Sequence, residues 1–436
     1  MSGLDEISIG SLAKGIRGVT YKPHQLKQDV GEEDFFLLRS NNIQNGNVVF
    51  SDRQIVDKVC VSEKQKLIKG DIIVCMSNGS RPLVGKSALI NLLDGNYCVG
   101  SFCSSFRSNV GVDPNFVFQV FRSTKFKNSI DVILSGSAIN NLQNKHIEEI
   151  KFNLPSSLAE QTRIAKILSK ADQAIEQTEK LIAKYQLIKT GLMQELLTKG
   201  IDEHGTIRNE KTHHFKTKQG LRVPEDWYVD VIDNLETDVL DFKANGSFET
   251  LTANVKYYYE QNYARLIRLT DLRNGLKYEG VFIDEKGFQF LKKTRLVEGD
   301  ILISCVGEYT GFVCQMPKVP YHATIAPNMF VVRFKDNIVN SFAYRYMNSS
   351  QFQNQILVVS TSSATKLLNN PNLRSLKLAI PPKEEQIEIA KKFDKIEKLI
   401  HDCKISLEKL QSLKTALMQD LLSGKVRVKI KEIEMV

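Results

Sequence analysis

Residues 160–198 read EQTRIAKILSKADQAIEQTEKLIAKYQLIKTGLMQELLT, and residues 385–423 read EQIEIAKKFDKIEKLIHDCKISLEKLQSLKTALMQDLLS. Shifted by 225 positions without a gap, the two stretches share 16 of 39 residues. Identity at this level over an ungapped segment indicates an internal duplication. The rest of the chain is organised around the two copies.

Apolar residues recur at alternating intervals of three and four in both copies. This spacing predicts long amphipathic helices whose apolar seams pack against another helix. The seam of the first copy consists of Ile164, Leu168, Ala171, Ile175, Thr178, Ile182, Tyr185, Leu192 and Leu196. The seam of the second copy consists of Ile389, Phe393, Ile396, Ile400, Cys403, Leu407, Leu410, Leu417 and Leu421.

Both seams are interrupted at the same place. Lys189 and Lys414 occupy a seam position there, next to Ile188 and Leu413. The sequence leaves two interpretations open. Either the seam opens at the lysine to admit a partner protein, or the neighbouring apolar residue takes over the packing.

The segments that precede the two helices also resemble each other. RSNNIQNG at 39–46 aligns with RLTDLRNG at 268–275, and LIKGDII at 67–73 aligns with LVEGDIL at 296–302, both at an offset of 229. The order is kept further along, where Ile147 to Pro155 align with Leu373 to Pro381. The chain is therefore predicted to be a tandem of globular domain, long helix, globular domain and long helix.

We predict an α+β protein with two globular α/β domains and an internal pseudo-twofold repeat. Such an axis would run the two equivalent helices in opposite directions, as an antiparallel coiled coil. A helix of 39 residues is about 60 Å long, roughly one to two turns of duplex DNA. The predicted boundaries are 1–153 and 224–380 for the globular domains, 154–200 and 381–424 for the helices, 201–223 for the connector, and 425–436 for the tail.

Local patterns predict the elements within these domains. Ser157 and Glu160 fit a capping box at the first helix, and Gly200 fits its end. The tail alternates apolar and basic residues, which fits either a short strand with Arg427, Lys429 and Lys431 on one face or a frayed end. One or two helices are expected near 125–134. Strands are expected at 35–40, 47–50, 70–76 and 116–121 and along the run that ends at 154.

Composition limits the class of protein. A chain of 436 residues exceeds one ordinary core, so two or three domains are expected. The net charge of +9 is spread along the chain, so it permits a nucleic-acid partner without requiring one. Seven scattered cysteines without a CxxC pair indicate reduced thiols. No apolar run approaches a membrane span and no signal peptide is evident, so the cytoplasm is the expected compartment.

No stretch of this sequence matches a catalytic, nucleotide-binding or metal-binding motif fully, so no catalytic or metal-ligating residues are expected. SRPLVGKS at 80–87 imitates a P-loop, but Ser80 replaces the first glycine and Pro82 lies inside the loop. The only Pro-Pro, at 381–382, lacks the context of an amino-methyltransferase motif. Asp131 with residues 149–151 imitates a nuclease pattern, a spacing that arises by accident in charged chains. His213 and His214 have no ligand partners at metal spacing.

Four motifs stand out along the chain: the EQxxIAK opening of each helix after a proline, the LMQ[ED]LL close, the GIDEHG connector and PEDW at 224–227. In these motifs and their order, the sequence resembles the specificity subunit of type I restriction-modification systems over nearly the whole chain. One difference is that the first half has no counterpart of Pro224 and Trp227.

This resemblance implies a non-catalytic subunit. Each globular domain would recognise one half of a bipartite site in double-stranded DNA, and the helices would dock two methyltransferase subunits. Restriction (translocase) subunits would join through that core. No cofactor is expected in this chain; S-adenosylmethionine, ATP and magnesium would belong to the partner subunits.

Residues that would contact DNA are sought among polar side chains in predicted turns, because Arg, Asn, Gln, Ser and Thr read base edges. In the first domain the candidates are Arg39, Asn41, Asn42, Asn78, Ser80, Arg81, Lys86, Ser137 and Asn140. In the second domain they are Arg268, Thr270, Asp271, Glu308, Tyr309, Thr310, Thr361, Ser363, Thr365 and Lys366.

Three other interpretations remain open from sequence. Each candidate residue could be an ordinary turn or surface residue. The whole chain could be a coiled-coil scaffold or dimerisation protein without DNA specificity, since lysine-rich outer helix faces are usually only solvated. The third interpretation is an enzyme with an unfamiliar active site.

Overall fold

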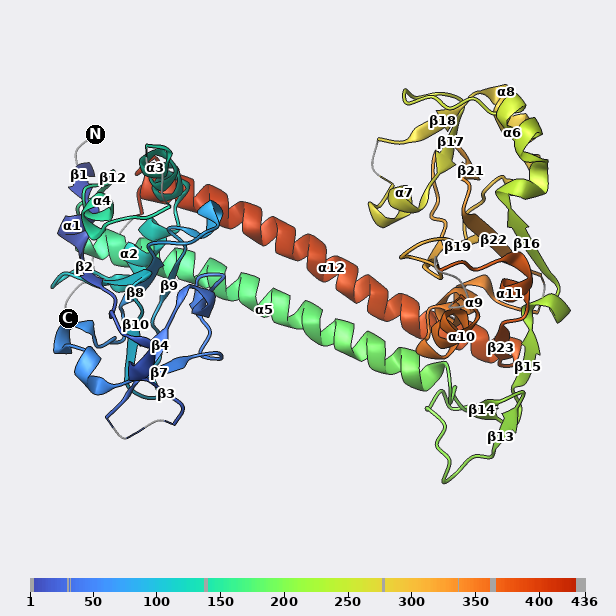
Figure 1. The fold of residues 1–436 in the computed structure, drawn as a ribbon, viewed down its shortest axis with the longest axis horizontal. Helices are drawn as coiled ribbons and strands as arrows, with labels where there is room; N and C mark the ends of the chain where they lie inside the picture. The colour runs from blue at the N-terminus through green and yellow to red at the C-terminus, as the bar shows by residue number, and fades with distance from the viewer. Residues whose placement is uncertain are drawn as a thin grey trace, which may run out of the picture. The chain divides into compact units, whose positions relative to one another are not determined.

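The computed structural model describes residues 4–29, 31, 33–136, 140–276, 279–335, 337–360 and 366–428. The chain divides into two compact units, one made of residues 1–180 and 404–436 and the other of residues 181–403. Two long helices, α5 (Leu158–Leu196) and α12 (Lys383–Leu422), each contribute one part to each unit (Figure 1). Within the described residues, no helix is both long and apolar enough to cross a membrane.

The first unit contains two four-stranded sheets and two short strand pairs. One sheet has the order β2 (Ala13–Arg17), β11 (Cys103–Ser108), β8 (Ile72–Cys75), β9 (Ser87–Leu89). The other has the order β10 (Tyr97–Val99), β4 (Phe35–Leu38), β7 (Gln54–Val56), β3 (Leu26–Lys27). The pairs are β1 (Leu4–Ser8) with β12 (Lys151–Pro155), and β5 (Ile43–Gln44) with β6 (Asn47–Val48). The helices are α1 (Ile9–Leu12), α2 (Pro114–Phe121), α3 (Thr124–Ser135) and α4 (Asn144–Glu148).

The second unit repeats this topology. Its larger sheet has the order β16 (Thr237–Asp241), β22 (Met329–Phe334), β19 (Ile301–Ser304), β20 (Val313–Gln315). A second sheet has the order β18 (Val281–Ile283), β17 (Ala264–Ile267), β21 (His322–Ile325). The pairs are β15 (Tyr228–Val231) with β23 (Lys377–Ile380), and β13 (Phe215–Lys218) with β14 (Leu221–Pro224). The helices are α6 (Phe248–Asn254), α7 (Leu269–Arg273), α8 (Glu285–Phe290), α9 (Asn340–Met347), α10 (Ser350–Ser360) and α11 (Asn370–Arg374).

The predicted repeat is confirmed in the main sheet, in one strand pair and in two helices of each unit. The strands β2, β11, β8 and β9 occur in the same order and the same antiparallel pairing as β16, β22, β19 and β20. The pair β1 with β12 corresponds to β15 with β23, and the helices α2 and α3 correspond to α9 and α10. The α+β class expected from the sequence is therefore correct.

The helix seams are most buried where they join a globular core. In the first unit, Ile164 and Leu168 of α5 lie in one cluster with Leu421 and Leu422 of α12. In the second unit, Leu196 of α5 lies in one cluster with the α12 side chains Ile389, Phe393, Ile396 and Ile400. The two helices thus pair in antiparallel fashion within each unit. The remaining seam residues Ala171, Ile175, Thr178, Ile182, Tyr185, Leu192, Cys403, Leu407, Leu410 and Leu417 are half-buried or just buried.

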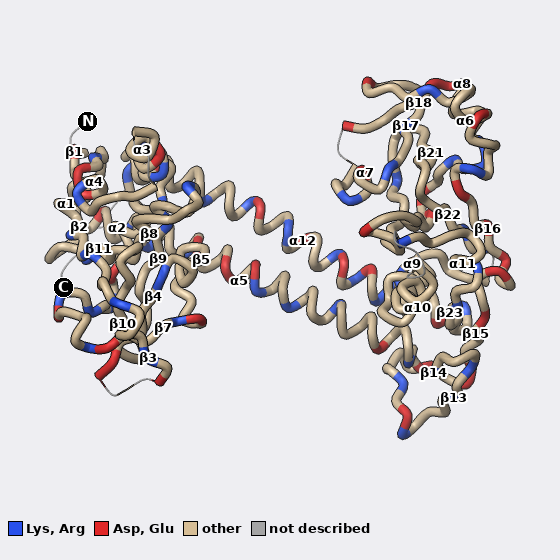
Figure 2. The backbone as a smooth tube through the Cα atoms, viewed as in Figure 1, with Lys and Arg blue, Asp and Glu red and all other residues tan. Residues whose placement is uncertain are grey.

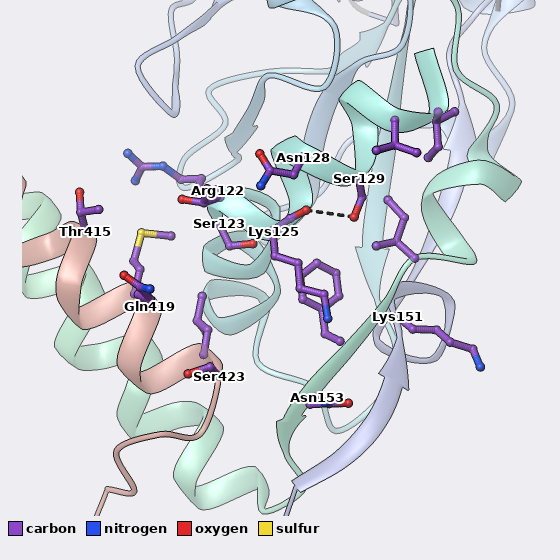
Figure 3. A pocket seen from close by; sticks show the side chains of 17 residues that line it. Arg122, Ser123, Lys125, Asn128, Ser129, Lys151, Asn153, Thr415, Gln419 and Ser423 are labelled. Carbon is purple, nitrogen blue, oxygen red and sulfur yellow. Dashed lines mark hydrogen bonds between the residues drawn. The ribbon is translucent and has the colours of Figure 1, made fainter. Parts of the chain in front are cut away.

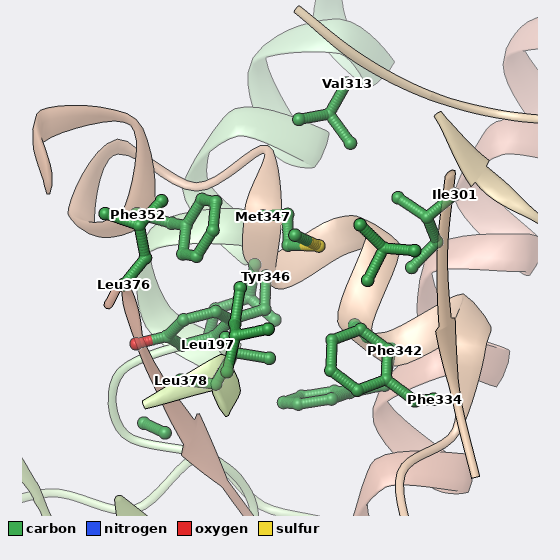
Figure 4. Close-up of a cluster of buried hydrophobic side chains, with 14 of the residues drawn as sticks. Leu197, Ile301, Val313, Phe334, Phe342, Tyr346, Met347, Phe352, Leu376 and Leu378 are labelled. Atoms are coloured by element: carbon green, nitrogen blue, oxygen red, sulfur yellow. The ribbon is translucent and has the colours of Figure 1, made fainter. Parts of the chain in front are cut away.

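The core of the second unit shows how a helix hairpin fills the gap between sheet and long helices. Phe342, Tyr346 and Met347 project from α9, and Phe352 projects from α10, toward Leu378 of β23 (Figure 4). All five side chains are fully buried. Clusters of this kind supply most of the stabilisation of each unit, because each large apolar side chain contributes about 1.5–3 kcal/mol when buried.

The predicted strand at 116–121 is wrong, because these residues form α2. Asp113 caps the helix by accepting from the amide of Asn115, and Pro114 occupies its first turn. All six residues from Phe116 to Phe121 are buried. A helix that is buried on every face has no apolar stripe, so its sequence resembles a buried strand.

Three other local expectations differ from the structure, among them the strand alternative for the tail. Glu160 does not form a capping box with Ser157; its carboxylate accepts two hydrogen bonds from Arg427, at 2.8 and 2.6 Å. The described part of the tail, residues 425–428, contains no strand, and Lys429 and Lys431 lie outside the described residues. The predicted strand at 47–50 is limited to Asn47–Val48.

Candidate nucleic-acid interface

Three of the candidate segments converge in the first unit. The turn after β4 meets the loop after β8 where Asn78 Nδ2 donates to Ser40 Oγ at 3.4 Å. The same loop meets the segment before α4 through an isolated bridge between Ser77 and Asn141 and a bond from Asn140 Nδ2 to the carbonyl of Gly79 at 3.5 Å. Residues separated by up to 100 positions in sequence therefore form one polar surface.

The candidate residues on this surface differ in whether their polar side-chain atoms are free to contact DNA. Asn42 is buried, and its amide is already used: Oδ1 accepts from Arg39 N, and Nδ2 donates to the carbonyls of Val49 and Ser51, all at 2.8 Å. Arg39 and Asn41 both bind the carboxylate of Asp52, at 3.3 and 2.5 Å. The geometry gives Asn42 a role in shaping the turn.

Arg81 and Lys86 lie beside a basic cavity of the same unit. Arg81 is exposed, and its Nη2 donates to the carbonyl of Asp131 in α3 at 2.7 Å. Both residues line a cavity of about 610 Å³ together with Arg122 and Lys127. Ser80, also exposed, donates its amide to Asn78 Oδ1. This cluster of cations suits phosphate oxygens or base acceptors.

The second unit brings the equivalent segments together. The loop after β19 meets the segment before α11 through an isolated bridge between Val306 and Leu367, the counterpart of the bridge between Ser77 and Asn141. Thr310 Oγ1 donates to the carbonyl of Lys366 at 3.0 Å, and the amide of Gly307 donates to the same oxygen at 3.1 Å. Lys366, Glu308 and Tyr309 are exposed.

The turn after β17 joins this surface through a stacked pair. The guanidinium of Arg273 lies 3.7 Å from the ring centroid of Tyr309, a cation–π contact. Thr270 is exposed on the same helix. Arg273 was missed as a candidate, although it stands in the repeated RLTDLRNG motif that drew attention to Arg268.

Asp271 is a structural residue of this turn. It is buried and accepts from Arg268 N, Nε and Nη2 at 2.9, 3.0 and 2.9 Å, and from Arg265 at 3.4 Å. Burial opposes its charge, but the bonds from Arg268 outweigh burial and lower the pKa of Asp271. The candidates Ser137, Thr361, Ser363 and Thr365 lie outside the described residues.

A charge cluster occupies the break in each helix seam; its lysine is buried in the first unit and half-buried in the second. In the first unit Lys414 of α12 forms an ion pair with Asp172 of α5, which also accepts from Arg122 at 2.8 Å and from Gln119 at 2.9 Å. Burial opposes the charge on Asp172, but Arg122 and Lys414 outweigh it, so the pKa of Asp172 is lowered.

The second unit has the equivalent cluster. Lys189 of α5 lies 2.6 Å from Glu397 of α12, and Arg345 binds Glu397 at 2.9 Å and Asp394 at 2.5 Å. Ile188 and Leu413 remain 40% and 53% exposed, so the interpretation that they take over the seam packing is wrong. The lysine instead reaches across the seam to a carboxylate.

A second pair of equivalent carboxylates, Glu385 and Glu160, lies near the start of each long helix. Each one binds an arginine from a distant segment of the chain. In the second unit buried Glu385 accepts from Arg208 at 2.6 Å, from the Ile201 amide at 2.8 Å and from Trp227 Nε1 at 3.2 Å. Burial raises the pKa of Glu385, against the opposing effect of Arg208. Gly200, at φ +64°, is required here because an added Cβ would lie 2.1 Å from Glu385 Oε1.

In the first unit the equivalent carboxylate is Glu160, which is bound by Arg427 of the tail. The hydrogen bonds from Arg427 lower the pKa of Glu160. Arg427 therefore serves the first unit as Arg208 serves the second. In the described part of the chain, no group of three or more His, Cys, Asp or Glu side chains could hold a metal ion.

A second cavity of the first unit lies beside the end of α12. It has a volume of about 900 Å³ and is bounded by α3, β12 and α12. Figure 3 shows Lys125 and Asn128 of α3, Lys151 and Asn153 of β12, and Thr415 and Gln419 of α12 around it. Apolar side chains such as Val132, Met418 and Leu422 complete the lining. A cavity of mixed apolar and basic character suits a protein partner more than a metal or a nucleotide.

Two globular units with matching polar surfaces, each joined to paired long helices, define a duplicated recognition protein. Sequence comparison agrees: the family described as "Type I restriction modification DNA specificity domain" matches residues 1–185 and 236–409. The chain belongs to this family, and its function is that of a non-catalytic DNA specificity subunit with two target-recognition domains.

Individual relatives cover almost the full chain. The type I restriction enzyme StySPI specificity subunit of Salmonella potsdam is 26% identical over 94% of this chain and 86% of the relative. The EcoKI specificity subunit of Escherichia coli is 24% identical over 87% of this chain and 79% of the relative. The putative MjaX specificity subunit of Methanocaldococcus jannaschii is 27% identical over 92% of this chain and 90% of the relative.

Solved structures share the fold. The crystal structure of a type I restriction-modification system S subunit from M. genitalium matches with a TM-score of 0.57 and 14% identity, over 96% of both chains. A chain from a study of complex assembly and conformational transition in a type I system matches with a TM-score of 0.55 and 16% identity, over 98% of this chain and 99% of the other.

Proposed function

We propose that this specificity subunit reads a bipartite DNA site. The polar surface of the first unit would contact one half-site, and the polar surface of the second unit would contact the other. The observation that carries the proposal is the repeated convergence of three polar segments, joined by the bridges at Ser77 and Val306 in equivalent places. We assign residues 1–153 and 224–380 to the two target-recognition domains, 154–200 and 381–424 to the helices, and 201–223 and 425–436 to connector and tail.

The proposed base-reading and phosphate-binding set is narrower than the sequence suggested. It omits Asn42 and Asp271, whose polar atoms are committed within the fold, and the acidic Glu308. It also omits Ser137, Thr361, Ser363 and Thr365, which lie outside the described residues, and it gains Arg273. The set consists of Arg39, Asn41, Asn78, Ser80, Arg81, Lys86, Asn140, Arg268, Thr270, Arg273, Tyr309, Thr310 and Lys366. Lys and Arg along the chain are interspersed with Asp and Glu (Figure 2), so local clusters of cations rather than a uniformly basic surface would contact the phosphates, and base contacts would provide the specificity.

The helices are the proposed docking site for methyltransferase subunits. Each unit exposes apolar side chains on them: Leu187 is 74% and Ile188 40% exposed in the second unit, and Leu413 is 53% exposed in the first. Exposed apolar residues on one element suit burial against another protein. The basic, partly apolar cavity beside α12 would extend that face in the first unit.

The equivalence of the two units predicts two docked partners. The full chain, co-expressed with its cognate methyltransferase subunit, should form a complex with two copies of that subunit. Mass photometry measures the stoichiometry, and Leu413→Asp together with Ile188→Asp should reduce it. A one-to-one species at saturating partner would contradict the proposal.

Catalytic chemistry is proposed to lie in the partners. S-adenosylmethionine would be bound by the methyltransferase subunits, and ATP and magnesium would serve the restriction subunits that join through them. The assembly would act on chromosomal and foreign DNA in the cytoplasm.

Arg81 provides a test that separates the two domains. Arg81→Ala should relax recognition in one half-site only, because Arg81 belongs to the surface of the first unit. A single lost contact to a base typically costs about 1–3 kcal/mol. Sequencing of adenine methylation in cells that express the variant with its partners measures the change. The matched variant Arg273→Ala should affect the other half only; equal relaxation of both halves by either variant would show that the residue acts through folding.

A further inference from the structure

In each unit, one further turn borders the polar surface formed by the three candidate segments, although it belongs to none of them. It links β10 to β11 in the first unit and β21 to β22 in the second, and its last residue before the strand is Phe102 or Asn328. Both residues are exposed, Phe102 to 68%. Neither belongs to the sequence motifs that pointed to the candidate residues.

The register of the sheets makes the two positions equivalent. Cys103 of β11 pairs with Cys75 of β8, and Met329 of β22 pairs with Ser304 of β19. The residue after each central strand then donates its amide to the turn: Met76 N to the Phe102 carbonyl at 2.8 Å, and Cys305 N to the Asn328 carbonyl at 3.0 Å. The same position of the fold therefore carries phenylalanine in one unit and asparagine in the other.

The turn is held against the polar surface by its backbone. In the first unit the amide of Ser77 donates to the Phe102 carbonyl at 3.2 Å. Ser77 also forms the isolated bridge to Asn141 on the polar surface. The amide of Gly100 donates to the carbonyl of Leu38, directly before Arg39, at 2.9 Å. In the second unit the corresponding bond runs from Ala326 N to the carbonyl of Ile267, directly before Arg268, at 2.8 Å.

The side chains at this position have different recognition chemistry. A phenylalanine that is mostly exposed on a firmly bonded turn lacks a core to fill, and an apolar side chain can contact the 5-methyl group of thymine in the major groove. Asparagine can bind adenine through its N6 and N7 atoms. Asn328 adopts φ +70°, a left-handed conformation that asparagine tolerates better than most residues, so its placement is fixed by the turn.

We infer that this position determines specificity in both domains: Phe102 contacts a thymine methyl group in one half-site, and Asn328 reads an adenine in the other. The inference rests on the proposed reading of a bipartite site. It adds one base position to each half that the candidate segments do not account for.

The test compares methylation targets of the full chain co-expressed with its partner subunits. Phe102→Ala should relax one A·T position in one half-site, and Asn328→Ala should relax one A·T position in the other, with the spacer unchanged. Leu92→Ala is the control, because Leu92 is 75% exposed in the first unit but lies outside the recognition segments. It should leave the target unchanged. A variant whose target equals that of the wild type, or that loses partner assembly instead, overturns the inference.

A chemical change in the DNA isolates the contact of Phe102. Replacing the thymine at the relaxed position by uracil removes only the methyl group, and it should weaken binding of the wild-type complex about fourfold. Phe102→Ala should bind both DNAs equally, and an equal loss in wild type and variant overturns the thymine contact. If the wild-type protein gives no bipartite target at all, the proposed function fails; a bipartite target with unchanged variants refutes this inference alone.

Discussion

Replacing Asp172 by alanine should lower the free energy of unfolding by about 3–5 kcal/mol, the usual cost of removing one partner from a buried ion pair. The variant leaves Lys414, whose side chain is 9% exposed, without its carboxylate, and leaves Arg122 and Gln119 without a shared acceptor. Chemical denaturation of the full chain, followed by circular dichroism, measures the loss. Glu176→Ala is the matched control on α5, since the exposed pair of Glu176 with Lys180 is worth about 0.3–0.5 kcal/mol.

The sole tryptophan separates the effects on the two units. Trp227 is buried in the second unit, so its fluorescence should report the effect of Glu397→Ala, the equivalent substitution there, more strongly than that of Asp172→Ala. If Asp172→Ala costs no more than the Glu176 control, the charge cluster does not stabilise the seam.

The Asp172 cluster also predicts a pH dependence. The pKa of Asp172 is lower in the folded protein than its ordinary value of 3.8, so its stabilisation is complete above that value and is lost as the pH falls through the lowered pKa. Asp172→Asn should therefore lose less stability than the wild type between about pH 4 and 2. An identical acid profile for the two proteins would contradict the assignment.

Lengthening both helices should change the spacer of the DNA target and leave the sequences of both half-sites unchanged. One heptad inserted at matched places in α5 and α12 adds about 10 Å, or roughly three base pairs, and should widen the spacer by that amount while both half-sites stay the same. Methylome sequencing of the variant measures the spacer, and an unaltered spacer would refute the role of the helices as a ruler.

Helical phase provides a control for this experiment. Three base pairs rotate the second half-site by about 100° around the duplex, so methylation by the one-heptad variant should be slow. Three heptads add about 32 Å, close to one turn of DNA, and should restore much of the rate. Equal rates for the two variants would indicate that the domains adjust their orientation freely.

The duplication made most of the fold predictable. The repeated seams and the offsets of 225 and 229 established the tandem, because a duplicated pattern does not depend on any single propensity. The strand predicted at 116–121 failed where burial on all sides of α2 removed the periodicity. The capping box at Glu160 failed because its true partner, Arg427, lies 267 residues away.

The candidate site was only partly predictable for a similar reason. Sequence alone singled out the motif of Arg39 and Arg268 but could not distinguish Asn42, which shapes the turn, from Asn41 on the surface. Phe102 was missed because it lacks a polar group and becomes a candidate only when backbone bonds place it beside Ser77. The role of Lys189 and Lys414 required the carboxylates of the opposite helix.

The most direct test of the central claim is single-molecule sequencing of adenine methylation in a host that expresses this chain with its cognate partners. The account predicts methylation at two short, different sequences separated by a constant spacer, and its disappearance when the chain is deleted. A contiguous target, or methylation that persists without this chain, would contradict it. A stable complex with the partners that methylates no defined site would favour the scaffold interpretation instead.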